Sequence, residues 1–446
     1  MTGSAAIPGL RATSRQVFSI AGPAMIGNLT TPMLGLVATA AIGRLGDATL
    51  LGGVAMASIV FDCLFWLFGF LRMSTVAFAA QAHGAGQSIE LRAVLLRGFA
   101  VAGLIGLLLI VLQIPLGSAL FAAMGGSEGV SRAAATYFSI RIWSAPLVLG
   151  NYAVLGWLVG QARATLALGV QIAINLVNMA ATVVLVLQLD FGIEGAALAA
   201  VIAEAVGLVL GVAVSLLLAR GAAKVPRAVL LDRAKLLRML AVNRDIMIRT
   251  AALIAAFLFF TAQGARAGDV TLAANAVLNN FLLVSAFFLD GLANAAEQLC
   301  GQAIGARNRQ YFVSATKLVM AWGFAFALAV SALYALGGAV LIDAMTASPE
   351  VRAAARDMLM LVALAPIVGV FAFAYDGVFI GATWAREMRN LMVASLLVFL
   401  AAWWLLKPFG NAGLWGALLV HYVARGGLQA WRYPAMVRVS FPHPST

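Results

Sequence analysis

The stretch FFLDGLANAAEQLCGQAIGAR, residues 287–307, places two carboxylates inside an otherwise apolar run. Glu297 lies seven residues after Asp290, with Asn294 between them at the fourth position, so a helix presents all three on one face. A charge at the centre of a bilayer costs about 2.5 to 3.5 kcal/mol on insertion scales. A membrane helix with this polar stripe is therefore expected to turn it towards the protein interior or a water-filled cavity.

The composition of the whole chain fits a polytopic membrane protein. Of its 446 residues, 63% are hydrophobic and 10% are charged, whereas soluble domains carry about 25% charged residues. Apolar runs of roughly 20 residues or more predict about twelve membrane-spanning helices. They lie near 14–43, 48–71, 91–116, 131–160, 164–188, 192–219, 242–265, 272–304, 310–342, 351–381, 386–406 and 411–433. The expected fold class is an all-α membrane protein, in which Cys63 and Cys300 pack as small residues.

The net charge of +12 indicates membrane topology rather than nucleic-acid binding. Most of the 29 Lys and Arg residues fall in the N-terminal segment, every second connection and the C-terminal tail. The positive-inside rule then places both termini in the cytoplasm, with anionic lipid headgroups as partners. Residues 1–13 lack a separate signal-peptide core, so we expect the first helix to remain as a span.

The two halves of the chain resemble each other at a nearly constant offset. AQAHGA at 80–85 is matched by GQAIGA at 301–306, and GWLVG at 156–160 is matched by GVFIG at 377–381, 221 residues later in each case. Two further pairs, RLGD with RAGD and GIEGAALA with GLWGALLV, follow the same order. These matches predict a repeat of six spans.

The basic segment 220–245 separates the repeats and is expected to be a cytoplasmic linker with a helix lying on the membrane surface. The predicted domains are an N-terminal six-helix lobe (1–219), this linker, and a C-terminal six-helix lobe (246–446). Because six is even, both lobes enter the membrane in the same direction. They are then expected to be related by a pseudo-two-fold axis along the membrane normal, with a cavity between them.

Four of the carboxylates within predicted spans are the candidates for ion coupling: Asp62, Asp290, Glu297 and Asp376. Burial favours the neutral form of a carboxyl group and a nearby cation favours the ionised form, so an acid balanced between the two can load and release protons. The structural alternative is that each acid locks one helix to another, with Arg425 as an available partner. We expect the proton to be the coupling ion in preference to sodium.

Other polar residues in the spans are expected to line a substrate cavity or support these acids. They are Asn28, Thr39, Asn178, Thr182, Gln263, Asn275, Asn294 and Arg425. The sequence contains no H-E-x-x-H, Walker A or G-x-S-x-G motif, so we expect neither an enzyme nor a metal or cofactor site. Without a nucleotide-binding motif, the transport mechanism that we expect is one driven by an ion gradient.

Several segments together resemble the multidrug and toxic compound extrusion (MATE) family, in its DinF-like branch. They are PMLGLVATAAIGRLGD, FGFLRMSTVAFAAQAHGAG, FFLDGLANAAEQLCGQAIGARNR, DGVFIGATWAREMRN and FGIEGAALAAVIAE. The resemblance covers nearly all twelve spans. It implies a V-shaped pair of six-helix lobes and cation-coupled export of amphipathic, often cationic compounds across the cytoplasmic membrane.

The chain departs from the DinF-like pattern in the N-terminal lobe. That pattern has an Asp in the first span as the proton-binding residue, where this chain has Ala38. It also often has an Asp four residues after an Asn in the fifth span, where Thr182 follows Asn178. Three interpretations stay open: the proton site has moved to Asp62, coupling depends on the C-terminal acids, or coupling is altered or lost.

The expected function is a proton-coupled exporter of drugs or metabolites that works by alternating access as a monomer. A flippase for lipid-linked precursors would have the same architecture but would favour a groove rich in Arg and Lys. We expect only Arg72, Arg141 and Arg425 to be available for such a groove. A receptor or assembly subunit is the alternative of another class, and it predicts no gradient-driven flux.

Overall fold

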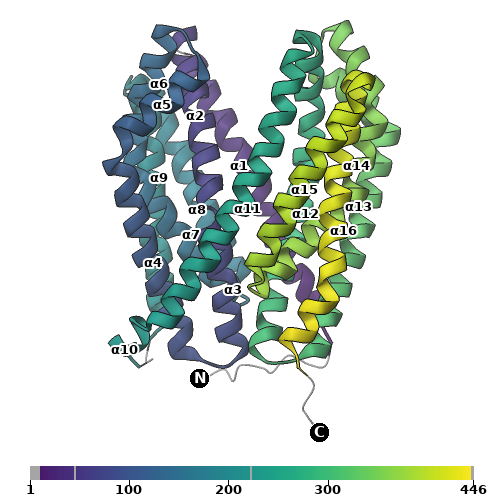
Figure 1. Ribbon diagram of the computed structural model, residues 1–446. Helices are drawn as coiled ribbons and strands as arrows, with labels where there is room; N and C mark the ends of the chain where they lie inside the picture. Colours follow the sequence, from purple (N-terminus) through teal and green to yellow (C-terminus); the bar gives the residue numbers. More distant parts are fainter. Residues whose placement is uncertain (1–10, 45–46, 221–222, 443–446) are drawn as a thin grey trace. The chain divides into compact units, whose positions relative to one another are not determined.

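The computed structural model describes residues 11–44, 47–220 and 223–442, and every regular element in these ranges is a helix (Figure 1). The chain forms two compact units. The first, here called the N-unit, consists of Ile26–His83 and Gln87–Leu240. The second, the C-unit, consists of Met1–Met25, Gly84–Gly86 and Ala241–Thr446.

Short breaks divide several long helices of the N-terminal half. Its elements are α1 (Ser14–Gly43), α2 (Ala48–Phe68), α3 (Phe70–Gly84), α4 (Ser88–Val111), α5 (Gln113–Met124), α6 (Glu128–Arg141), the 3-10 helix η1 (Ile142–Ser144), α7 (Ala145–Gly160), α8 (Ala164–Thr182), the π-helix η2 (Val183–Gln188), α9 (Gly192–Leu218) and α10 (Arg227–Leu230). α2 begins where the Asp47 carboxylate accepts hydrogen bonds from the backbone N–H groups of Thr49 and Leu50.

The helices of the C-terminal half are longer and mostly unbroken. They are α11 (Arg233–Arg266), α12 (Asp269–Gly305), α13 (Arg309–Met345), α14 (Pro349–Gly381), α15 (Ala385–Leu406), the 3-10 helix η3 (Lys407–Phe409) and α16 (Gly410–Ser440). Side chains cap two of them: Asn308 accepts from the N–H of Tyr311, and Ser348 accepts from the N–H of Val351. Gly410, with φ 58°, makes the turn into α16.

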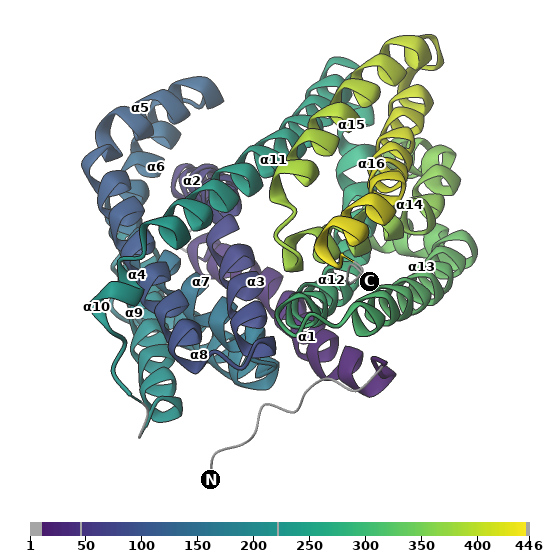
Figure 2. The same cartoon turned by 60° about the horizontal axis from the view of Figure 1, so that its bottom comes forward.

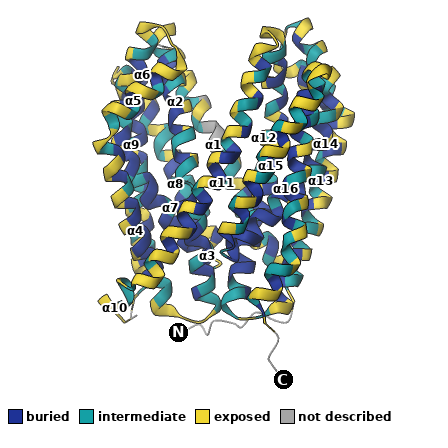
Figure 3. Ribbon diagram, in the orientation of Figure 1, coloured by how far each residue is buried: buried dark blue, intermediate teal, exposed yellow. Residues whose placement is uncertain are grey.

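By length and composition, ten segments of the described helices could cross a membrane; α15 and α16 count as one of these segments, and α1 is not among the ten. The predicted spans correspond to α1, α2–α3, α4–α5, α6–α7, α8–η2, α9 and each of α11 to α16. Exposed positions, yellow in Figure 3, include large apolar side chains such as Ile114 (80% exposed) and Leu336 (90% exposed). This pattern suits lipid rather than water, and the predicted fold class of twelve helices in two lobes is confirmed.

The repeated motifs GWLVG and GVFIG pack helices together in the same way within each unit. A Cβ on Gly156 of α7 would lie 2.6 Å from the carbonyl oxygen of Arg72 in α3. A Cβ on Gly377 of α14 would lie 2.2 Å from the carbonyl oxygen of Ala293 in α12. Only glycine permits this approach of two backbones, which is the usual reason for paired small residues in membrane helices.

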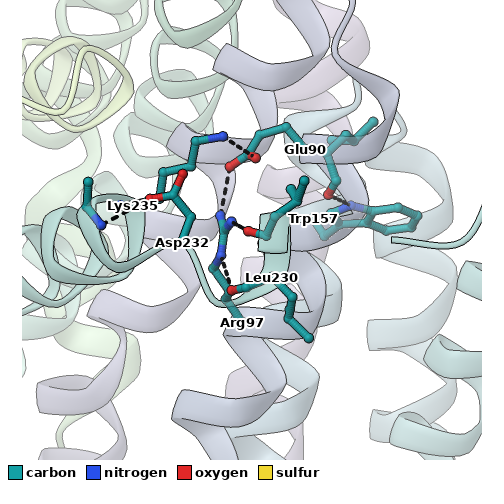
Figure 4. A network of polar contacts seen from close by, with 9 residues as sticks. Glu90, Arg97, Trp157, Leu230, Asp232 and Lys235 are labelled. Atoms are coloured by element: carbon teal, nitrogen blue, oxygen red, sulfur yellow. Dashed lines mark hydrogen bonds and ion pairs between the residues drawn. The ribbon is translucent and has the colours of Figure 1, made fainter. Parts of the chain in front are cut away.

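A buried arginine holds the linker against α4 within the N-unit, as Figure 4 shows. Arg97 of α4 is 3% exposed; its Nη1 lies 2.7 Å from Glu90 Oε1, and its Nε donates to the carbonyl oxygen of Leu230 at 3.1 Å. Arg97 also donates to the carbonyl oxygen of Val229. Lys235 Nζ binds the other oxygen of Glu90 at 2.6 Å. The linker is therefore held by ion pairs and backbone contacts together.

The expected surface helix in the linker differs from what the structure contains. In the part of the linker that the structure describes, only the four residues of α10 form a separate helical turn. The Asp232 carboxylate accepts from the backbone N–H groups of Ala234 and Lys235, at 3.0 and 3.2 Å, and so starts α11 at Arg233. With no proline after that cap, the helix continues to Arg266 and includes the second half of the predicted linker.

Candidate functional site

The candidate site lies on α14, which packs against α12, α13 and α16 within the C-unit. Figures 1 and 2 agree on this placement, with α14 beside α13 and α16 in both views. The glycines of the GVFIG motif draw α14 against α12. Since Asp376 directly precedes this motif, the close packing fixes the place of its side chain.

Two arginines and a glutamine surround the Asp376 carboxylate. Arg425 of α16 donates to its Oδ2, and Arg249 of α11 forms an ion pair with the same oxygen. Gln429, one turn after Arg425, donates to Oδ1 at 2.6 Å. None of these four residues is more than 5% exposed. The arrangement joins three helices through charge-assisted hydrogen bonds, which are the strong ones.

The two acids of α12 lie in different surroundings although they share a helix face. Glu297 is buried at 3% exposure, whereas Asp290 is exposed. Both interact electrostatically with Arg249, and Asp290 also interacts with Arg425. Asp376, Asp290 and Glu297 therefore belong with the two arginines to one electrostatic cluster, which we call the C-cluster.

The amides predicted to support the acids have mixed environments. Asn275 is buried, exchanges hydrogen bonds with Asn411 at 2.9 and 3.0 Å, and accepts one from Trp415 Nε1 at 2.9 Å. These bonds tie α12 to α16 and give Asn275 a structural task. Asn294 is buried and Gln263 is half-buried.

The N-unit has no comparable cluster at the positions expected from the sequence. Asp62 is exposed and interacts electrostatically with Arg141. The remaining predicted positions differ in exposure: Asn28 and Asn178 are half-buried, Thr39 is exposed, and Thr182 is buried and donates to Asn178 Oδ1 at 3.4 Å. Ala38, which stands where the DinF-like pattern has an Asp, is half-buried.

Two residues that contact Asp376, Arg249 and Gln429, are not among the site residues predicted from the sequence. Arg249 lies beyond the predicted linker (220–245), inside the apolar run predicted to span the membrane at 242–265. Gln429 follows Arg425 by four residues, so a helix places both on one face. The position of Arg249 in an apolar run and the spacing of Gln429 from Arg425 could have indicated both residues from the sequence.

Among the described residues, no group of three or more His, Cys, Asp or Glu could hold a metal ion.

Comparison with known proteins agrees with this architecture. The MatE family model matches residues 23–184 and 246–404, one segment in each half of the chain. DNA damage-inducible protein F of Escherichia coli (strain K12) is 37% identical over 94% of this chain and 91% of its own length. The probable multidrug resistance protein NorM of Rhizobium meliloti (strain 1021) is 25% identical over 89% of this chain and 88% of its own length.

Solved structures support the fold independently. A crystal structure of MATE in the bent conformation superposes with a TM-score of 0.89, at 18% identity, over 97% of this chain and 98% of that one. An outward-facing multidrug resistance MATE family transporter gives a TM-score of 0.87, at 18% identity, over 96% of this chain and 97% of that one. The resemblance found in the sequence is thus confirmed. The chain belongs to the multidrug and toxic compound extrusion family, in its DinF-like branch, and is a multi-pass membrane transporter rather than an enzyme.

Proposed function

We propose that this transporter is a proton-coupled antiporter that exports small amphipathic compounds across a bacterial cytoplasmic membrane. The observation that carries the proposal is the charge balance of the C-cluster, where three carboxylates accompany two arginines. If all five are ionised, the cluster has one negative charge in excess. Unbalanced charge is costly inside a membrane protein, so the cluster favours binding one proton or one monovalent cation.

The contacts divide the tasks among the three acids. Asp376 receives two guanidinium groups and an amide, so it stays ionised and anchors the helices. Asp290 is exposed and can therefore exchange a proton with solvent. It also interacts electrostatically with the positive charge of Arg249. We assign the coupling proton to Asp290 and a supporting role to buried Glu297.

Substrate class follows from the same chemistry. A cationic amphipathic compound can compete with a proton for an exposed carboxylate, and competition of this kind gives antiport. The name of the NorM relative supports drug-like compounds as substrates. The lipid-precursor flippase alternative gains no support, because Arg249 and Arg425 are already held by Asp376. The two units of one chain supply both lobes, so the proposed working form is a monomer.

Purified protein in proteoliposomes tests the proposal, with a pH gradient or a sodium gradient imposed separately. A fluorescent cationic amphipath should accumulate under the pH gradient alone. Asp290→Asn should abolish this uptake, because the carboxamide keeps the shape and removes the ionisation. Glu350→Gln, an exposed position at the start of α14, is the matched control and should transport normally. Sodium-driven uptake, or uptake by neither gradient, would contradict proton coupling.

Membrane orientation is a separate part of the proposal and needs its own experiment. The positive-inside distribution supports a cytoplasmic location for both termini and for the linker. A cysteine introduced as Arg227→Cys should react with a membrane-impermeant maleimide in broken cells but not in intact cells. Labelling in intact cells would refute this orientation.

A further inference from the structure

The N-unit contains an acid that the coupling scheme above does not use. Glu204 lies on α9 and is mostly but not completely buried. Asn151 of α7, which is 2% exposed, donates from Nδ2 to Glu204 Oε2 at 2.7 Å and to the Glu204 carbonyl oxygen at 3.0 Å. One amide thus holds both the side chain and the backbone of the glutamate.

The hydrogen bonding of this pair is incomplete when Glu204 is ionised. Asn151 Oδ1 is buried and has no hydrogen-bond partner among the described residues. A buried acceptor left without a donor costs about 1 to 3 kcal/mol. A carboxylate offers no donor, whereas a carboxylic acid offers one O–H. A proton on Glu204 would therefore supply the donor that Asn151 Oδ1 lacks and complete an acid–amide pair.

The charged groups around Glu204 are compatible with a proton on its carboxylate. α9 packs against α6, η1, α7, α8 and η2. Arg141 of α6 and Tyr152 of α7 interact electrostatically with Glu204, while Arg72 and Asp62 act on Tyr152 from α3 and α2. The sequences of η1, α8 and η2 contain no ionisable side chain.

Arg141 is the cation that interacts electrostatically with Glu204, but its guanidinium contacts other side chains. Its Nη1 donates to Tyr137 Oη at 3.1 Å, and its guanidinium lies 4.7 Å from the ring centre of Phe61. Within the described part of the chain, Glu204 has no ion pair with Lys, Arg or His. Asp376, in contrast, has two. Burial without a contacting cation favours the neutral acid, whereas the two arginines keep Asp376 ionised.

The internal repeat places this pair on equivalent helices. Glu204 plus the 221-residue offset is Arg425, and α9 with α7 corresponds to α16 with α14. Each unit therefore joins the same two helices by a polar pair. The pair in the C-unit is ionic, and the pair in the N-unit is an acid with a neutral amide.

From these contacts we infer that Glu204 is a proton-binding residue of the N-unit and that Asn151 holds its protonated form. Proton uptake at the carboxylate makes an O–H that donates to Asn151 Oδ1, and release returns the proton to water. The inference rests on the proposed proton-coupled transport. It adds a second site, in the unit where Ala38 replaces the acid expected from the family resemblance.

Infrared difference spectroscopy of the reconstituted full-length protein, stepped between acidic and alkaline pH, tests this directly. The wild type should show a carbonyl band of a protonated carboxylic acid that is absent from Glu204→Gln. Gln preserves both hydrogen bonds of the acid form, so this variant should fold. Asn151→Leu, which removes the amide, should retain the band at a shifted frequency. Glu194→Gln, at the exposed start of α9, is the matched control and should leave the band unchanged.

Transport measurements separate this inference from the proposed function. Under a pH gradient, Glu204→Gln should lose most of the driven uptake, while Glu194→Gln should keep it. Driven uptake in the wild type together with an unchanged band and unchanged uptake in Glu204→Gln would overturn the inference and leave the proposed function standing. A Glu204 band in a wild type without pH-driven uptake would instead refute the proposed function while the protonation of Glu204 stood.

Discussion

Removing the Asp376 carboxylate should destabilise the C-unit more than any other change of one carboxylate. Asp376→Asn keeps the size of the side chain but leaves Arg249 and Arg425 buried, at 5% and 3% exposure, without their counter-ion. Breaking a buried ion pair from one side costs about 3 to 5 kcal/mol. Asp290→Asn changes an exposed group, for which the loss should be about 0 to 1 kcal/mol.

Thermal unfolding in detergent, followed by tryptophan fluorescence, provides the measurement. The melting temperature should fall steeply for Asp376→Asn and little for Asp290→Asn. Adding Arg425→Gln to Asp376→Asn removes one of the two uncompensated charges and should restore part of the loss. Equal melting temperatures for the two single variants would refute the anchoring role of Asp376, as would a double variant less stable than Asp376→Asn alone.

Three further predictions concern packing, the linker and the N-unit acid. Gly381→Ala should lower the free energy of unfolding by about 1 to 3 kcal/mol through overpacking, because its Cβ would lie 2.3 Å from a backbone oxygen of α12. The control is Gly427→Ala, whose Cβ would meet nothing within 4 Å. Equal melting temperatures for the two variants would contradict this prediction. Arg97→Gln should release the linker and speed its cleavage by added protease, relative to exposed Arg132→Gln, and an unchanged cleavage rate would show that other contacts hold it. Asp62→Asn should keep pH-driven uptake, since we place the N-unit proton elsewhere; loss of uptake in a folded variant would return the role to Asp62.

The membrane spans could be predicted from sequence because each depends on a local property. An apolar run long enough to cross a bilayer specifies a helix without knowledge of its neighbours. The same logic failed in the linker, where the charged residues after Arg233 indicated a separate element. There the Asp232 cap begins a helix that the apolar run then continues.

The candidate site could be predicted only in part because its partners are set by tertiary packing. The position of Asp376 inside an apolar run marked it as unusual, and Arg425 was named as an available cation. The contribution of Arg249 depends on how α11 is rotated against α14, and no periodicity in either helix contains that information. The pairing of Asn151 with Glu204 was missed for the same reason, since the two residues come from different helices.

Counter-transport in proteoliposomes tests the central claim, proton antiport through Asp290, most directly. Vesicles are loaded with a cationic amphipath and a pH-sensitive dye, with no pH or sodium gradient imposed at the start. Outward movement of the compound through the wild type should drive protons inward and acidify the lumen, and Asp290→Asn should show no such acidification. Substrate efflux through the wild type at constant lumenal pH would contradict the account.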